Sequence, residues 1–159
     1  MDIVHSPNPP DEFRIIGYFE SWNKERECLH MDVSKIPEVI PTGWGAGDYT
    51  HIHFAFPDLT TDLTVDVSKV QDQFDGFKKL PSKHKKIISF GGWAFSNDAG
   101  TYDIFRKLVA NEVNRQKGAR NVIRFLTEHN LDGLDFDWEY PGVSPTGSWS
   151  DPLRLTCFL

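Results

Sequence analysis

The 159 residues of this chain are enough for one globular domain and too few for a large multidomain assembly. Hydrophobic residues (39%) and charged residues (25%) occur in the proportions of a folded protein, which excludes intrinsic disorder of the whole chain. The net charge of −6, with no basic run longer than the four residues 83–86, argues against nucleic acid as a partner.

The start of the chain and its two cysteines say little about the function of the protein. Residues 1–12 are rich in proline, lack the basic start and apolar run of a secretion signal, and are predicted to be a flexible leader. No stretch of about 18 apolar residues occurs, so no membrane span and no membrane partner are expected. Cys28 and Cys157 lack the paired spacing of a zinc site. We interpret Cys28 as half of a disulfide in a longer parent or as a buried residue, rather than as a reactive thiol.

Four segments have the composition of buried strands, and segments with a helical period lie between them. The predicted strands are residues 14–20, 49–56, 86–91 and 133–140. The predicted helices are 34–39, 67–80, 102–110 and a segment around 122–126 that ends at His129 and Asn130. The crossover between the first two strands is broken by prolines and glycines, so we expect it to be mostly loop.

This alternation predicts an α/β fold with parallel strands joined by right-handed crossovers, as in α/β barrels and doubly wound sheets. No Gly-x-Gly-x-x-Gly follows the first strand, and no phosphate loop is present. The nucleotide-binding form of such a fold is therefore disfavoured.

The most informative segment is the acidic strand at residues 131–142. Three carboxylates alternate there with three apolar residues: Asp135, Asp137 and Glu139 with Leu134, Phe136 and Trp138. Alternation along a strand places the carboxylates on one face, with successive members roughly 6.6 Å apart. Full ionisation of all three is opposed electrostatically, so at least one should hold a proton near neutral pH, or the trio should hold a metal.

Two other interpretations of these polar residues compete with a catalytic one. A solvated acidic edge strand explains a generic D-x-D-x-E, but the apolar opposite face favours a buried parallel strand. A metal site is weaker, because hard cations prefer ligands gathered from loops. His51 and His53 form an H-x-H pair without a third ligand, which favours core histidines over a metal site.

Four motifs in the same order resemble family 18 glycoside hydrolases, the chitinases and their relatives. Residues 132–139 look like the D-G-x-D-x-D-x-E motif, and residues 89–93 resemble the S-x-G-G marker of the third barrel strand. Residues 17–22 and 53–56 are similar to the first two strands. The amino-acid sequence around Trp22 and Trp93 looks most like that of the fungal chitinases related to killer-toxin subunits.

The resemblance covers about residues 13–142 and implies the first four units of a (β/α)8 barrel, with 1–12 as leader and 143–159 as an irregular tail outside the family. It also implies substrate-assisted hydrolysis with retention, without cofactor or metal. Glu139 would be the general acid. Asp137 would orient the substrate acetamide and stabilise the oxazolinium, while Asp135 would share a proton with Asp137.

The resemblance further implies a set of residues around the sugar. Tyr18 and Ser89 would hydrogen-bond near Asp135, and Trp93 would stack on a sugar ring. The expected substrate-binding residues are Tyr18, Phe56, Ser89, Gly91, Gly92, Trp93 and Tyr140. Asp132 and Gly133 are expected to be structural. For Tyr18 and Trp93, ordinary core packing is the competing interpretation.

The implied substrate is chitin or its oligosaccharides, and the implied location is extracellular or the cell wall. A full barrel takes about 250 residues, so we expect a truncated, marginally stable chain with little or no activity. Alternatives are a chitin-binding lectin, an inactive fragment and an endo-acting N-acetylglucosaminidase. The fungal-chitinase sequence around Trp93 disfavours the last of these. The sequence does not indicate an oligomeric state.

Overall fold

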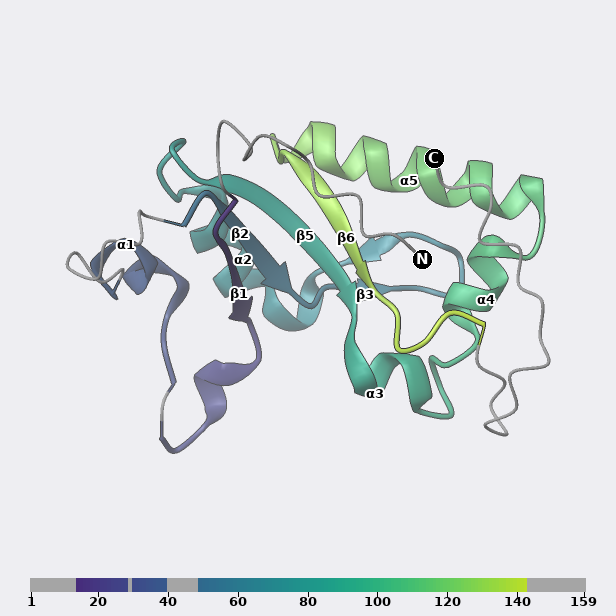
Figure 1. Cartoon of the computed structure of the whole chain (residues 1–159), viewed down its shortest axis with the longest axis horizontal. Coiled ribbons are helices and arrows are strands. Elements are labelled where there is room, and N and C mark those ends of the chain that lie inside the picture. Colours follow the sequence, from purple (N-terminus) through teal and green to yellow (C-terminus); the bar gives the residue numbers. More distant parts are fainter. Residues whose placement is uncertain (1–13, 29, 40–48, 143–159) are drawn as a thin grey trace, which may run out of the picture.

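The computed structural model describes residues 14–28, 30–39 and 49–142. Its main sheet has four parallel strands in the order β1-β2-β5-β6 (Figure 1). The strands are β1 (Ile16–Glu20), β2 (His51–Ala55), β5 (Lys85–Gly91) and β6 (Gly133–Asp137). The predicted alternation of parallel strands and crossovers is therefore confirmed. The expected leader and the expected tail lie outside the described residues.

The crossovers contain the predicted helices and two elements that the sequence pattern did not predict. The helices are η1 (Asn23–Glu25), η2 (Val33–Lys35), α1 (Ile36–Val39), η3 (Ser68–Val70), α2 (Gln71–Lys78), α3 (Gly92–Asn97), α4 (Ile104–Val109) and α5 (Glu112–Glu128), where η marks a 3-10 helix. The unpredicted elements are α3 and a small antiparallel pair, β3 (Asp58–Leu59) with β4 (Val65–Asp66). Both are too short for a periodic pattern to show them.

Helix α5 begins well before the segment in which the sequence shows a helical period. Its first half is almost entirely polar, which hides it from a search for apolar periodicity. The Asn111 side chain instead marks its start by accepting a hydrogen bond from the Asn114 N–H at 2.9 Å. The helix ends at Glu128, and Asn130 follows with a positive φ of 52°.

The hydrophobic core lies between one face of the sheet and the helices. Phe54 of β2 is fully buried, and its ring centroid lies 5.0 Å from that of Phe77 in α2. On the same face, towards the β6 edge of the sheet, Phe105 of α4 meets Phe136 of β6 edge-on at 5.7 Å. We call this the helix-covered face, and the opposite one the polar face.

The fourth strand is shorter than predicted. It ends at Asp137, because its last paired residue lies opposite Gly91, where β5 stops and the chain turns into α3. The apolar row is also incomplete: Phe136 and Trp138 pack against the core, whereas Leu134 is exposed. Strand β6 is the last strand of the described sheet, so no further strand there covers Leu134.

Candidate active site

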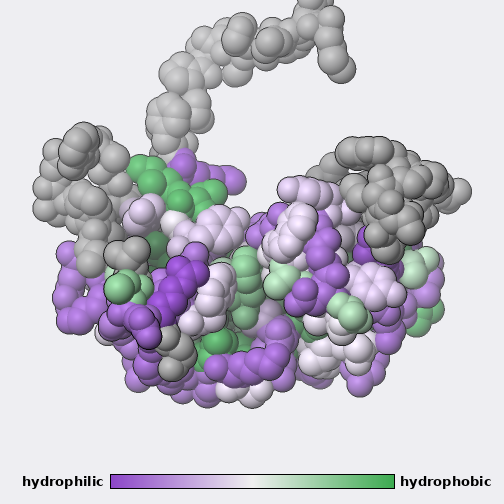
Figure 2. Space-filling model, turned by 90° about the horizontal axis from the view of Figure 1, so that it is seen from below, coloured by the Kyte–Doolittle hydropathy of each residue, from purple (hydrophilic) through white to green (hydrophobic). Residues whose placement is uncertain are grey.

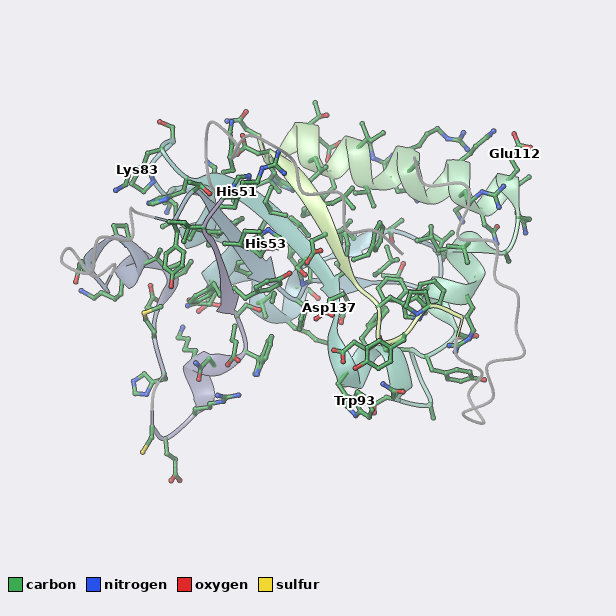
Figure 3. The ribbon with its side chains drawn as sticks, in the orientation of Figure 1. His51, His53, Lys83, Trp93, Glu112 and Asp137 are labelled. Atoms are coloured by element: carbon green, nitrogen blue, oxygen red, sulfur yellow. The ribbon has the colours of Figure 1, made fainter. Side chains whose placement is uncertain are left out.

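The polar face gathers side chains from all four strands near their carboxyl ends. Tyr18 of β1 lies opposite His53 of β2 in the strand register, and Ser89 of β5 lies opposite Asp135 of β6. Asp137 follows one pleat further along β6. Because these strands are parallel and adjacent, residues distant in the sequence meet here. Figure 3 shows Asp137 between His53 and Trp93 in that view.

One carboxylate oxygen of Asp135 is the meeting point of the cluster. Tyr18 Oη donates to Asp135 Oδ2 at 2.9 Å, and Ser89 Oγ donates to the same atom at 2.7 Å. The His53 Nδ1 atom lies 3.3 Å from it. The first two contacts are those that the family resemblance implies for Tyr18 and Ser89.

The surroundings of Asp137 raise its affinity for a proton. Desolvation by burial, followed by the charges of Glu139 and Asp135, raises the pKa of Asp137 above its usual value. Partial burial, the hydrogen bond to Asp135 and the two aspartate charges raise the pKa of Tyr18 to about 12. Tyr18 therefore stays a neutral donor at physiological pH, and Asp137 binds a proton more readily than a free aspartate does.

Glu139 lies beyond the end of β6, so the prediction that strand alternation carries all three acids is wrong at this residue. Its main chain is held by helix α3 instead. The Glu139 N–H donates to Ser96 Oγ at 3.0 Å, and the Glu139 carbonyl accepts from Asn97 Nδ2 at 3.4 Å. The position of the third acid thus depends on a tertiary contact.

Gly91 and Gly92 allow the backbone to turn from β5 into α3 directly beside the acids. Gly91 has a φ of +117°, and a Cβ there would overlap the carbonyl oxygen of Asp137. Gly92 has a φ of +80°, and its Cβ would lie 2.7 Å from the Phe56 ring. Both glycines are therefore required by close approach as well as by conformation.

The aromatic residues expected to bind sugar surround the acids. Tyr18, Trp93 and Tyr140 are 54%, 64% and 57% exposed, so none of them is the core aromatic of the competing interpretation. Phe56 is half-buried and stacks on Trp22 with a centroid distance of 5.4 Å. Figure 2 views the molecule from below, the side where α3 and the strand ends lie in Figure 1, and shows hydrophilic and hydrophobic residues interspersed there.

A cleft of about 300 Å³ includes Phe56, one of the residues expected to bind sugar. Its lining combines aromatic residues and charges: Ser21, Trp22, Lys24, Phe56, Asp58, Asp66, Lys69, Val70 and Asp72. The three acids of the motif do not line it. Proximity of the donors and acids, rather than this cleft, defines the candidate active site.

Asp132 and Gly133 lie at the other end of β6. Asp132 accepts from the Lys86 N–H at 2.9 Å and from Lys85 Nζ at 3.0 Å, which ties the start of β6 to β5. A Cβ at Gly133 would lie 3.1 Å from the Ile87 side chain. These contacts hold the sheet together away from the acids.

The remaining polar candidates do not form a site. Within residues 14–28, 30–39 and 49–142, no group of three or more His, Cys, Asp or Glu could hold a metal ion. His51 Nδ1 lies 2.8 Å from Thr50 Oγ1. Cys28 is exposed and free, so its interpretation as a buried residue is wrong, and Cys157 lies outside the described residues.

Two site residues escaped the sequence prediction. His53 was interpreted as a core histidine, yet its ring contacts Asp135. Ser96 was not singled out, yet it holds the Glu139 main chain. One signal was available. His53 lies two residues before the end of β2, and Ser89 and Asp135 likewise lie two residues before the ends of β5 and β6.

Fold and site together define part of an α/β barrel-type domain with an acidic row at the carboxyl end of its fourth parallel strand. The model of the glycosyl hydrolases family 18 matches residues 14–151, and the chain belongs to this family. The match extends into the segment from 143 onward.

Among curated proteins, the chain is 43% identical over its whole length to the secreted chitinase LysM12 of Penicillium expansum, of which it covers 10%. It is 41% identical, over 82% of its length, to the killer toxin subunits alpha/beta of Kluyveromyces lactis, of which it also covers 10%. The resemblance to killer-toxin-related fungal chitinases is thus confirmed. The chain spans 10% to 14% of the length of the first Penicillium relatives.

Solved chitinase structures share the fold. The catalytic domain 2 of the Ostrinia furnacalis Group II chitinase superposes with a TM-score of 0.65 at 26% identity, covering 88% of this chain and 36% of that one. The Trichuris suis chitinase gives a TM-score of 0.61 at 27% identity, covering 82% and 34%. The partial (β/α)8 barrel is therefore confirmed. Among the described residues, the helices are too short or too polar to cross a membrane.

Proposed function

We propose that the chain supplies the catalytic strand of a chitinase, which hydrolyses β-1,4-linked N-acetylglucosamine polymers by substrate-assisted catalysis with retention. The observation that carries the proposal is the acidic row with its donors: Asp135 accepts from Tyr18 and Ser89, and the pKa of Asp137 is raised. The family match and the chitinases among its relatives support the substrate class.

Each acid has a separate role in the proposed reaction. Glu139 protonates the glycosidic oxygen and later takes a proton from water. The acetamide oxygen of the substrate, rather than a protein carboxylate, attacks the anomeric carbon. Asp137 orients that acetamide and stabilises the positive oxazolinium, and Asp135 is the partner that shares a proton with Asp137.

The aromatic side chains around the acids suit a polysaccharide substrate. Trp93 presents most of its ring to solvent next to the acidic row, as a stacking surface for a sugar requires. The Ostrinia furnacalis Group II chitinase domain was solved in complex with the oligosaccharide (NAG)5. We propose chitin or its oligosaccharides as the partner and, by analogy with the secreted relative, an extracellular or cell-wall location.

The test is turnover of a fluorogenic chitobioside by the 159-residue chain and by Glu139→Gln. We expect slow turnover by the wild type, because the four described strands leave Tyr18 and Trp93 open to water. The Glu139→Gln variant should lose at least about 100-fold of that rate, since it removes the general acid. Turnover that survives the substitution contradicts the proposal.

The second candidate function is chitin binding without hydrolysis, favoured by the exposed Trp93 beside a site whose acids lie open to water. Retention of the chain on chitin beads without turnover of the chitobioside would support this binding function. The absence of both retention and turnover would indicate an inactive fragment.

A further inference from the structure

His53 contacts Asp135, one of the two aspartates proposed to share a proton, although the proposed reaction does not use His53. Its Nδ1 lies 3.3 Å from Asp135 Oδ2, and the residue is only 8% exposed. The imidazole ring also lies against the Tyr18 ring, with a centroid distance of 4.7 Å and an interplanar angle of 55°. The imidazole ring is therefore held in place by Tyr18, which itself donates a hydrogen bond to Asp135.

The protonation of His53 Nδ1 decides which aspartate can carry a proton. Tyr18 and Ser89 already donate to Oδ2, which suits a charged carboxylate with its several lone pairs. If Nδ1 bears a hydrogen, the imidazole can only donate there, and a proton on Oδ2 would oppose it. If Nδ1 is bare, a protonated Asp135 could donate to it, and Asp137 would then be left charged.

We infer that His53 is a positioning residue that donates its Nδ1–H to Asp135, so that Asp135 acts only as an acceptor and the shared proton resides on Asp137. A neutral Asp137 separates Asp135 from Glu139 and avoids three adjacent charges. The consequence for turnover rests on the proposed function, whereas the tautomer of His53 is a property of the folded chain alone.

The first experiment measures that tautomer by nitrogen-15 NMR of the 159-residue chain with labelled histidine at pH 8. The chain has six histidines, and His53→Asn identifies the signal of His53 by removing it. We expect a protonated Nδ1 and a bare Nε2. A protonated Nε2 with a bare Nδ1 would overturn the inference. His51→Asn is the matched control, because His51 lies one pleat earlier on β2 and contacts Thr50.

The second experiment separates the donor from mere packing. Asn places an amide nitrogen where His has Nδ1, whereas Leu places a methyl group there. We expect His53→Leu to lower kcat about tenfold with KM unchanged, and His53→Asn to retain most of kcat. Circular dichroism confirms that both variants are folded. Equal losses in the two variants, or a loss in neither, would overturn the inference.

The two experiments keep this inference distinct from the proposed function. If the wild-type chain has no chitobioside turnover, the proposed function fails for this chain. The NMR result still decides the inference about His53 in that case, because it requires no substrate.

Discussion

The two faces of the sheet differ in what their side chains do. On the helix-covered face, Phe54, Ile88 and Phe90 are fully buried under the helices. On the polar face, the same strands carry His53, Ser89 and the aspartates, which contact one another and leave their aromatic neighbours exposed. Alternation by two along each strand produces both faces from the same segments.

This difference separates stability from chemistry. The helix-covered face removes large apolar side chains from water, which is the dominant favourable contribution to folding. The polar face holds partly buried acids close together, which opposes folding but shifts proton affinities. Substitutions on the first face should therefore change the free energy of unfolding, and substitutions on the second should change proton binding and substrate contacts.

The largest effect is expected for Phe54→Ala. Removing a fully buried ring that contacts Phe74 and Phe77 should lower the free energy of unfolding by about 3–5 kcal/mol, measured by urea denaturation. Ile16→Ala is the control on the polar face, where the side chain is 47% exposed and the loss should stay within about 0.5 kcal/mol. Similar losses in both variants would contradict the division between the faces.

The turn from β5 into α3, beside the acids, should be sensitive to Gly91→Ala. The new Cβ would meet the carbonyl oxygen of Asp137 in a backbone conformation that disfavours side chains, so we expect a loss of about 1–3 kcal/mol in thermal unfolding. Gly100→Ala is a matched control, because nothing lies within 4 Å of its added Cβ. A Gly100→Ala loss as large as that of Gly91→Ala would refute this explanation.

The polar face should show its cost in the pH dependence of stability. Folding raises the pKa of Asp137 above 3.8, so its stabilising contribution is present below that pH and is lost as the pH rises through the raised value. Asp137→Asn should therefore be more stable than the wild type at pH 7, and this difference should disappear at pH 3. Urea denaturation at both pH values measures it.

Asp75 provides a control of opposite sign. Its hydrogen bond with Lys78 lowers the pKa of Asp75, so its contribution is present above 3.8 and is lost as the pH falls. Asp75→Asn should therefore be less stable than the wild type at pH 7. The same direction of change in both variants would show that burial and neighbouring charge do not govern Asp137.

The smallest change in stability is expected for Trp93→Ala. Because the ring is mostly exposed, the free energy of unfolding should change by less than about 0.5 kcal/mol. Retention on chitin beads should nevertheless fall, since a stacking surface is lost. Val113→Ala, an exposed residue on α5, should alter neither quantity. Unchanged retention in Trp93→Ala would remove this residue from the sugar site.

Much of the fold followed from local patterns. The composition of the four segments predicted β1, β2, β5 and β6, because a buried parallel strand needs apolar side chains whatever its neighbours are. The same patterns missed α3 and the first half of α5. A short helix has no period, and a polar helix shows none.

The candidate site was predictable as far as motifs carry it. The D-G-x-D-x-D-x-E and S-x-G-G motifs identified Asp135, Asp137 and Ser89 as members of one site, and alternation placed both aspartates on one face. The contact of His53 with Asp135 could not be predicted, because it joins residues 82 positions apart through the register of three strands.

The sequence by itself determined the alternation of strands and crossovers, the acidic row and the two glycines, because these depend on neighbours along the chain. Only the tertiary structure decided where β6 ends, that Ser96 holds Glu139, and that three side chains converge on one oxygen of Asp135. These features depend on how parallel strands align side by side. That alignment is set by packing across the whole sheet rather than by any local pattern.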